Sequence, residues 1–443
     1  MRRLVPVILI AVTILAYMPV FKNGFVYDDH FQIERNPYIK DFRHLNVLLT
    51  KDVWHFSPNT KSNNYRPLHM ISYLLIYKLS GLNPVVYHAF GLLFYVLTVL
   101  LIWKIYTHYV DSLPAFSGAL LFAAHPVHVE VVAWIGGFPD LLCCLFLLLS
   151  FYLYRGGRLA FSLLSFLFAV FSKETALVFP ALVASDYALF RKQDRNQTIL
   201  WGAGAGMLIL FYAGLRVYAL GSFMRTTQDG FHLLSMAHST VAFAGFYLGK
   251  MLFPFQLNAF YHFIMPLSFK VSWSGILLSL SALLLAYAMR KNRVFVLGCI
   301  WFVLFLIPAL TLKDVSPVLF AERYLYLSSA GLILALVALP LKRYFFPILI
   351  AIAIGFAGMS YARTKVWHDD LSLWKDTVEK SPLSHTVNYN IATAYLKNRE
   401  YAEARQYYQS AIQIESKKAD SYYNLAICEF HLGHKDVAAD LLR

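Results

Sequence analysis

Long apolar stretches separated by polar turns dominate the first 362 residues of the chain. The first stretch runs from Leu4 to Phe21, follows two arginines and lacks a small-residue cleavage site, so we interpret it as a retained span. A helix needs roughly 20 apolar residues to cross a bilayer, and it must satisfy its own backbone polar groups there. The pattern therefore predicts a multi-span helical membrane protein. Further spans are expected at residues 84–106, 113–128, 141–155, 158–172, 176–190, 199–220, 273–290, 294–312, 324–340 and 345–362.

Two segments depart from this simple alternation. Residues 22–83 form a long polar segment after the first span, and its two semi-apolar stretches, 42–54 and 67–79, predict interfacial helices lying along the membrane. Residues 236–254 are only weakly apolar, so the chain has eleven or twelve spans. Eleven spans would place the tail and residues 22–83 on the same, outer side.

The distribution of positive charge decides between these counts. Basic residues gather in short clusters between apolar stretches, as the positive-inside rule describes. Only eleven spans bring the clusters at 290–293 and 342–343 to the inner side together with Arg2 and Arg3. We therefore expect eleven spans.

The last 80 or so residues repeat with a period of 34. Four residues of the first unit recur at the same offset in the second: Tyr389, Asn390, Ala392 and Ala404 match Tyr423, Asn424, Ala426 and Ala438. This period, with small residues at helix contacts, is typical of tetratricopeptide repeats. The sequence thus predicts an all-α protein with a transmembrane domain over residues 1–362 and an α-solenoid tail over 363–443.

Composition agrees with a membrane protein and argues against other classes. Hydrophobic residues make up 58% of the chain and charged residues only 14%, whereas soluble domains carry about 25% charged residues. The net charge of +14 would suggest nucleic-acid binding in a soluble protein, but here it follows the positive-inside pattern. The four cysteines show no metal-type spacing and predict no disulfide framework.

Polar side chains gather at the outer ends of the predicted spans, where ionisable groups are costly and tend to be functional. Asp28 and Asp29 follow the first span directly. Adjacent carboxylates raise each other's pKa, and one of them would suit a general base for an acceptor hydroxyl. The alternative is a solvated loop that only ends a helix.

A second polar cluster follows the third predicted span. His125, His128 and Glu130 precede Asp140 there, and this set is either a weak metal-ligand signature or a polar helix end broken by Pro126. The sequence leaves a divalent metal open.

Cations form the remaining candidates. Lys173 lies beside Glu174, and the two side chains would simply pair in the plainest interpretation. Arg323 stands between Glu322 and Tyr324 at the start of the tenth predicted span, and Arg66 lies in the first polar segment. The guanidinium fork of an arginine at this depth matches phosphate oxygens.

The order of these motifs resembles the GT-C superfamily of membrane glycosyltransferases. It is most similar to the transmembrane-and-tetratricopeptide O-mannosyltransferase-like proteins and their bacterial relatives. The ordered set is an acidic pair, Arg-Pro-Leu, His-Pro-x-x-x-Glu ending in Asp, Ser-Lys-Glu and Glu-Arg-Tyr-x-Tyr-Leu. The chain departs from many relatives at residues 136–140, where no Arg precedes Asp140.

The resemblance implies an enzyme that transfers a sugar, such as mannose, from a polyprenyl-phosphate donor to an acceptor hydroxyl on the non-cytoplasmic face. The membrane would be a bacterial inner membrane or the endoplasmic reticulum. Asp28 would be the usual catalytic carboxylate, Asp29 and Glu130 would be the other catalytic candidates, and Asp140 would be a further acidic site position. Cations facing the donor phosphate would be Arg66, Lys173 and Arg323.

Other functions remain open from the sequence. Tetratricopeptide stacks present peptide-binding surfaces, which favours a protein acceptor bound through the tail. A transferase for a glycolipid or envelope polysaccharide is the alternative of the same chemistry. A non-catalytic membrane scaffold or a transporter is the alternative of another class, although no internal inverted repeat of the transporter type is visible.

Overall fold

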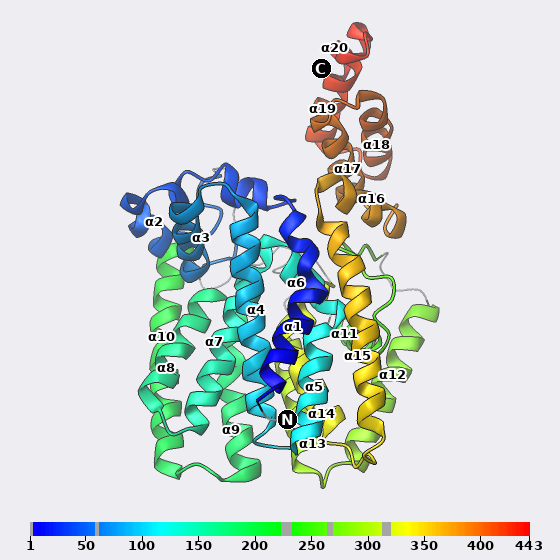
Figure 1. The fold of residues 1–443 in the computed structure, drawn as a ribbon. Helices are drawn as coiled ribbons and strands as arrows, with labels where there is room; N and C mark the ends of the chain where they lie inside the picture. The colour runs from blue at the N-terminus through cyan, green and yellow to red at the C-terminus, as the bar shows by residue number, and fades with distance from the viewer. Residues whose placement is uncertain (1–2, 58–61, 223–232, 264–268, 312–319) are drawn as a thin grey trace.

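The computed structural model describes residues 3–57, 62–222, 233–263, 269–311 and 320–443. These residues form helices and turns without a strand, so the predicted all-α class is confirmed. A bundle of long helices carries a smaller helical unit at one end (Figure 1).

The bundle follows the predicted spans closely. Its helices are α1 (Val5–Tyr17), α4 (Pro84–Tyr106), α5 (Ser112–Ala124), α6 (Val129–Ala133), α7 (Phe138–Arg155), α8 (Leu159–Ser172), α9 (Phe179–Phe190), α10 (Arg195–Leu220), α11 (Leu233–Leu252), α12 (Phe269–Ala288), α13 (Arg293–Thr311), α14 (Leu325–Val337) and α15 (Phe345–Thr364). By length and composition, six described helices can cross a membrane, or seven if the bent pair α5–α6 is one span. The predicted count of eleven spans is therefore not confirmed.

The predicted span 113–128 is broken rather than continuous. Helix α5 ends at Ala124, and the chain continues after a 48° bend into the short helix α6. Pro126 lies at the break. Proline interrupts a helix because it has no backbone N–H and its ring clashes with the preceding turn. The bend turns Glu130, in α6, away from the direction of α5.

The polar segment after α1 contains one substantial helix. Helix α3 (Pro67–Ser80) matches the second predicted interfacial helix and ends at Gly81, whose φ of +62° suits glycine. The first predicted helix, 42–54, is wrong in length, because only a 3-10 turn and α2 (Leu45–Thr50) form. The Asp52 carboxylate accepts a 2.7 Å hydrogen bond from the Trp54 amide, and such local bonds favour a turn over a helix.

Basic clusters from different parts of the chain lie together at the end of the bundle away from the smaller helical unit. Arg293 donates a 3.2 Å hydrogen bond to the Leu189 carbonyl, beside the cluster at 191–195. Asn292 donates a 2.6 Å hydrogen bond to the Ala338 carbonyl, shortly before the cluster at 342–343. Arg2 lies outside the described residues.

The tail is a stack of antiparallel helices that continues from α15. Its helices are α16 (Asp370–Lys380), α17 (His385–Lys397), α18 (Tyr401–Ile414), α19 (Ala419–His431) and α20 (Lys435–Leu441). The repeated alanines Ala392, Ala404, Ala426 and Ala438 are all buried between helices, as the repeat predicts. The Gly24 amide donates a 2.8 Å hydrogen bond to the His368 carbonyl. The tail and the first polar segment therefore lie at the same end of the bundle (Figure 1).

Candidate active site

The acidic pair lies in a tight turn between α1 and a short π-helix, His30–Glu34. Tyr27 opens the turn with a φ of +55°, a strained value for a residue with a side chain. Asp28 is half-buried, and among the described residues its carboxylate has no hydrogen-bond or ion-pair partner. Burial raises the pKa of Asp28 to about 6, while the nearby Arg323 acts in the opposite direction.

Asp29 has a different environment from its neighbour. Its side chain is buried and accepts hydrogen bonds from the backbone amides of Val26 (3.2 Å) and Gly136 (2.8 Å). These bonds tie the acidic turn to the loop before α7. Glycine is required at the adjacent position, because a Cβ on Gly137 would lie 2.4 Å from the Val131 carbonyl oxygen. The geometry gives Asp29 a structural role in this loop.

Arg323 pairs with Glu130 from the bent segment. The Arg323 guanidinium donates through Nη1 to Glu130 Oε1, and its backbone amide donates to Oε2 at 2.9 Å. Glu130 is buried, and the Arg323 side chain retains 19% exposure. The guanidinium lies near the rings of Trp134 and Tyr324, at 5.8 Å and 5.2 Å from their centroids. Within the described residues, Nε and Nη2 of Arg323 make no hydrogen bond.

The other two candidate cations are paired with carboxylates as well. Lys173 Nζ donates to both oxygens of Asp140, at 2.6 Å and 2.8 Å. Arg66 donates through Nε and Nη2 to the two oxygens of Glu174, at 3.0 Å and 2.6 Å. The plain interpretation that Lys173 pairs with Glu174 is therefore wrong. The backbone is extended at Lys173, and the two neighbouring side chains point to different partners.

These pairs converge on one region. Lys173 Nζ lies 5.6 Å from the centroid of the Tyr324 ring, which the Arg323 guanidinium also contacts. Asp140 interacts electrostatically with both Arg66 and Arg323, and Arg323 with Asp28. The fold thus brings together seven of the predicted site residues: Asp28, Arg66, Glu130, Asp140, Lys173, Arg323 and Tyr324.

The two histidines lie outside this region. His125 hydrogen-bonds through Nε2 to the Met251 carbonyl at 3.0 Å. His128 hydrogen-bonds to Ser329 Oγ and Tyr95 Oη, both at 2.9 Å. Both rings are buried among helices, so their contacts are those of core histidines. In the part of the chain that the structure describes, no three His, Cys, Asp or Glu residues form a group that could hold a metal.

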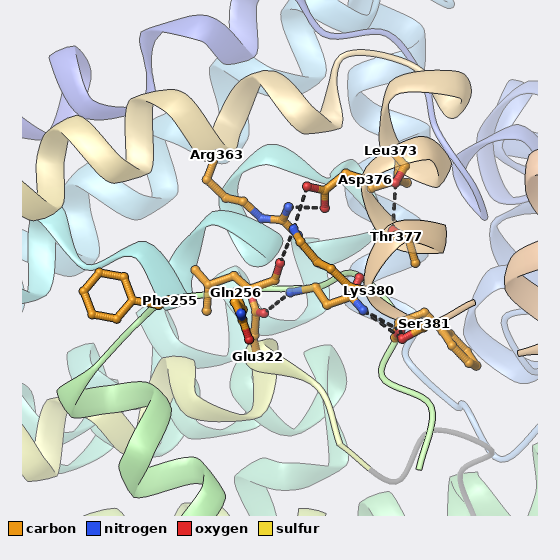
Figure 2. A network of polar contacts seen from close by, with 12 residues as sticks. Phe255, Gln256, Glu322, Arg363, Leu373, Asp376, Thr377, Lys380 and Ser381 are labelled. Atoms are coloured by element: carbon orange, nitrogen blue, oxygen red, sulfur yellow. Dashed lines mark hydrogen bonds and ion pairs between the residues drawn. The ribbon is translucent and has the colours of Figure 1, made fainter. Parts of the chain in front are cut away.

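Glu322 turns away from its neighbour Arg323 into a separate network. Its Oε1 accepts hydrogen bonds from the Asn258 amide (2.6 Å) and the Tyr261 hydroxyl (2.5 Å). Burial raises the pKa of Glu322 to about 7, and Arg363 opposes that rise. Figure 2 shows this carboxylate beside Arg363, at the junction between the bundle and α16.

Three residues near the site were not selected from the sequence. Glu174 belongs to the Ser-Lys-Glu motif but was expected only as a partner of Lys173. Trp134 and Asp370 belong to no motif, and their contacts join residues at least 107 positions apart in the chain. The Trp134 ring lies 5.8 Å from the Tyr27 ring, and the Asp370 carboxylate accepts a 2.9 Å hydrogen bond from the Tyr27 amide.

The tail matches a known repeat family, and most of the chain is similar to proteins named O-mannosyl-transferases. A family model described as "Tetratricopeptide repeat" matches residues 371–420 and 389–443. A protein O-mannosyl-transferase of Caenorhabditis elegans is 24% identical over 432 residues, which cover 92% of this chain and 62% of that protein. The predicted resemblance is confirmed.

Human relatives carry the same name. Protein O-mannosyl-transferase TMTC4 of Homo sapiens is 27% identical over 483 residues, covering 90% of this chain and 64% of that protein. Protein O-mannosyl-transferase TMTC1 of Homo sapiens is 34% identical over 206 residues, covering 41% of this chain and 23% of that protein. The chain therefore spans less than two thirds of the length of these relatives.

Proposed function

We propose that this chain is a membrane glycosyltransferase that moves a hexose, such as mannose, from a polyprenyl-phosphate donor to a hydroxyl group of an acceptor protein. The names of its relatives support sugar transfer to protein. The reaction would take place on the non-cytoplasmic face, in a bacterial periplasm or in the lumen of the endoplasmic reticulum. The same proposal assigns sugar transfer to residues 1–362 and binding of the acceptor protein to residues 363–443.

The surroundings of Asp28 carry this proposal. It is the one carboxylate of the described site cluster without a partner, and its pKa of about 6 lies near neutrality. A general base works best when its pKa is close to the operating pH. In the proposed step the acceptor oxygen attacks the anomeric carbon, its proton passes to Asp28, and the bond from that carbon to the phosphate oxygen breaks.

The three cations suit the leaving phosphate. Each keeps a donor after pairing: Arg323 keeps Nε and Nη2, Arg66 keeps Nη1, and Lys173 has a third N–H. Their carboxylate partners hold them in place before the donor arrives. A lipid phosphate needs positive charge more than a strong acid as it departs, and preorganised charge is an effective way to stabilise a transition state.

Carboxylates around the cations serve a second purpose. A sugar that loses its phosphate develops oxocarbenium character, which nearby negative charge stabilises, as in glycosidases. Glu130 and Asp140 lie in the described cluster with the three cations. We assign them to positioning of Arg323 and Lys173 and to the negative potential of the site.

The decisive experiment is sugar transfer by purified protein in nanodiscs. A panel of polyprenyl-phosphate sugars is offered with an acceptor protein, and the product is identified by mass spectrometry. We expect transfer from one donor and a loss of about 10²-fold or more in Asp28→Asn, because general-base help supplies about that much. Equal turnover of the wild type and Asp28→Asn would remove Asp28 from the mechanism.

The same assay separates the alternatives. Transfer to a glycolipid or polysaccharide but to no protein would select the related transferase function. Absence of transfer from every lipid-linked sugar would contradict the enzyme and leave the scaffold and transporter, which flux measurements in proteoliposomes distinguish.

A further inference from the structure

The first helix of the tail holds the turn that carries Asp28. The two oxygens of the Asp370 carboxylate accept hydrogen bonds from different points of that turn. Oδ1 accepts from the Tyr27 amide and Oδ2 contacts His30 Nε2, both at 2.9 Å. Asp28 lies between these two anchored residues, so one carboxylate of the tail fixes the backbone on both sides of it.

Other groups in the tail strengthen this contact. Lys397 Nζ, from α17, donates to Asp370 Oδ2 at 2.7 Å. Burial alone raises the pKa of Asp370, but hydrogen bonds from His30 and Lys397 lower it to about 2, so the group is anionic near neutral pH. The Trp374 ring, one turn along α16, contacts the Tyr27 ring edge-on at 5.2 Å.

Backbone strain makes an external anchor necessary. Tyr27 has a φ of +55°, and such a conformation persists only when the surrounding structure imposes it. The side chain of Tyr27 is held between Trp134 of the bundle and Trp374 of the tail. The tail supplies both the ring contact and the acceptor for the Tyr27 amide.

We propose that Asp370 is a positioning residue for Asp28, through which the tetratricopeptide tail sets the geometry of the catalytic base. The inference rests on the proposed function and deepens it. An acceptor held by the tail would then contact the same helical unit that orients the base. Asp370 itself is not catalytic, because it contacts Tyr27, His30 and Lys397 rather than Asp28.

A second junction contact provides a matched control. Asp376, on the same helix α16, pairs with Arg363 (2.5 Å) and with Lys380 (2.6 Å). Lys380 also donates to the Leu257 carbonyl at 2.8 Å, and Figure 2 shows this network around Arg363 and Ser381. Asp376 attaches the tail to the bundle without a hydrogen bond or ion pair to the acidic turn among the described residues.

The pH dependence of turnover reports the position of Asp28. Described groups that interact electrostatically with it are Arg323, Asp29, Tyr27 and Tyr73. Burial, the larger influence, raises the pKa of Asp28 and Arg323 lowers it, so a turn that moves changes both influences. Loss of the anchor should therefore move the acid limb of the kcat/KM profile away from its wild-type position.

The test compares Asp370→Ala with Asp376→Ala in the full chain in nanodiscs, because an asparagine oxygen at position 370 would still accept from the Tyr27 amide. For Asp370→Ala we expect kcat to fall about tenfold or more, the KM for the lipid donor to stay within about twofold, and the acid limb to shift. Asp376→Ala should keep the wild-type acid limb. Equal kcat and equal acid limbs in the two variants would overturn the inference.

Hydrogen exchange of residues 24–34 provides a readout that needs no activity. Exchange there should accelerate in Asp370→Ala and stay unchanged in Asp376→Ala. His30→Ala, which removes one of the two anchors, should give the same change at smaller amplitude and serves where Asp370→Ala yields little folded protein. If the wild type transfers no sugar, the proposed function fails, while unchanged exchange in both anchor variants would refute the positioning role itself.

Discussion

Asp28 and Asp29 are adjacent in the chain and differ in what surrounds them. Two backbone amides satisfy Asp29, which is buried, whereas the carboxylate of Asp28 is partnerless among described residues. Burial raises the pKa of Asp29 well above its usual value, although its two backbone hydrogen bonds act in the opposite direction. The two neighbours therefore differ in access: Asp29 is enclosed and holds the loop, whereas Asp28 is partly exposed and free to exchange a proton.

The raised pKa of Asp28 predicts how transfer depends on pH. A general base acts only when deprotonated, so kcat/KM should fall as the pH drops through about 6, where Asp28 takes up its proton. The same shift implies that the charged form is unfavourable in the folded protein. At neutral pH, Asp28→Asn should therefore keep or raise the melting temperature while losing activity. A pH–rate profile and a thermal melt check the two halves of this prediction.

Arg323 has two separable roles, in stability and in donor binding. Arg323→Ala leaves the buried Glu130 without its cation, and breaking such a pair costs about 3–5 kcal/mol. Arg323→Lys keeps the charge but loses the fork, so donor affinity should fall partially, and in Arg323→Ala it should fall strongly.

The double variant Arg323→Ala/Glu130→Gln separates these roles. It removes both charges of the pair and should recover much of the lost stability. Thermal melts and donor titrations of all three variants provide the measurement. Recovered stability together with normal donor affinity would contradict a phosphate role for Arg323.

At the scale of elements, hydropathy alone located the bundle. Helix α4 occupies Pro84–Tyr106, as expected, because Asn83 caps its start, Pro84 fits its first turn and the apolar run continues for the length of a span. The break after α5 was visible only as Pro126 within an apolar run. Segment 42–54 was predicted too long, because local bonds around Asp52 compete with the helix.

The candidate site could be predicted in its members but not in its pairings. Motif order selected Asp28, Lys173 and Arg323. The packing of α7, α8 and the bent segment decides which carboxylate pairs with which cation. Sequence spacing alone does not predict this packing. Glu174, next to Lys173 in the chain, pairs instead with Arg66, 108 residues earlier. Asp370 was missed for the same reason, because its contacts join the two ends of the chain.

Close packing of α13 on α14 depends on two glycines. A Cβ on Gly331 would lie 2.5 Å from the Phe302 amide nitrogen and 2.6 Å from the Gly298 carbonyl oxygen, so the backbones would have to separate. Small residues at such crossings let membrane helices approach. Gly331→Ala should therefore lower the melting temperature.

Gly355, in α15, provides the control. Nothing in the described structure lies within 4 Å of a Cβ added there. Alanine is favoured over glycine inside a helix by about 1 kcal/mol, so Gly355→Ala should leave the melting temperature unchanged or raise it slightly. Equal melting temperatures for the two variants would show that the crossing tolerates a methyl group.

At the scale of the whole molecule, the two ends of the bundle differ in charge and in function. Basic clusters from three loops meet at one end of the bundle. The first polar segment and the tail lie at the other end (Figure 1), where Asp370 of the tail contacts the acidic turn. Lys and Arg in short loops favour the cytoplasmic side. The tail should therefore lie with the first polar segment on the side away from the cytoplasm, which is the side where a lipid-linked sugar and the proposed protein acceptor would meet Asp28.

Cysteine labelling tests this orientation. Arg43 and Tyr423 are exposed in the first polar segment and in the tail, and Tyr344 is exposed beside the basic cluster at 342–343. Single cysteines at these positions, in a background where the four native cysteines are replaced, are treated with a membrane-impermeant maleimide in sealed, oriented vesicles. Positions 43 and 423 should react from the same side, and position 344 only from the other. Labelling of 43 and 423 from opposite sides would contradict both the topology and the contact between Asp370 and the acidic turn, because a hydrogen bond cannot join residues on opposite faces of a bilayer.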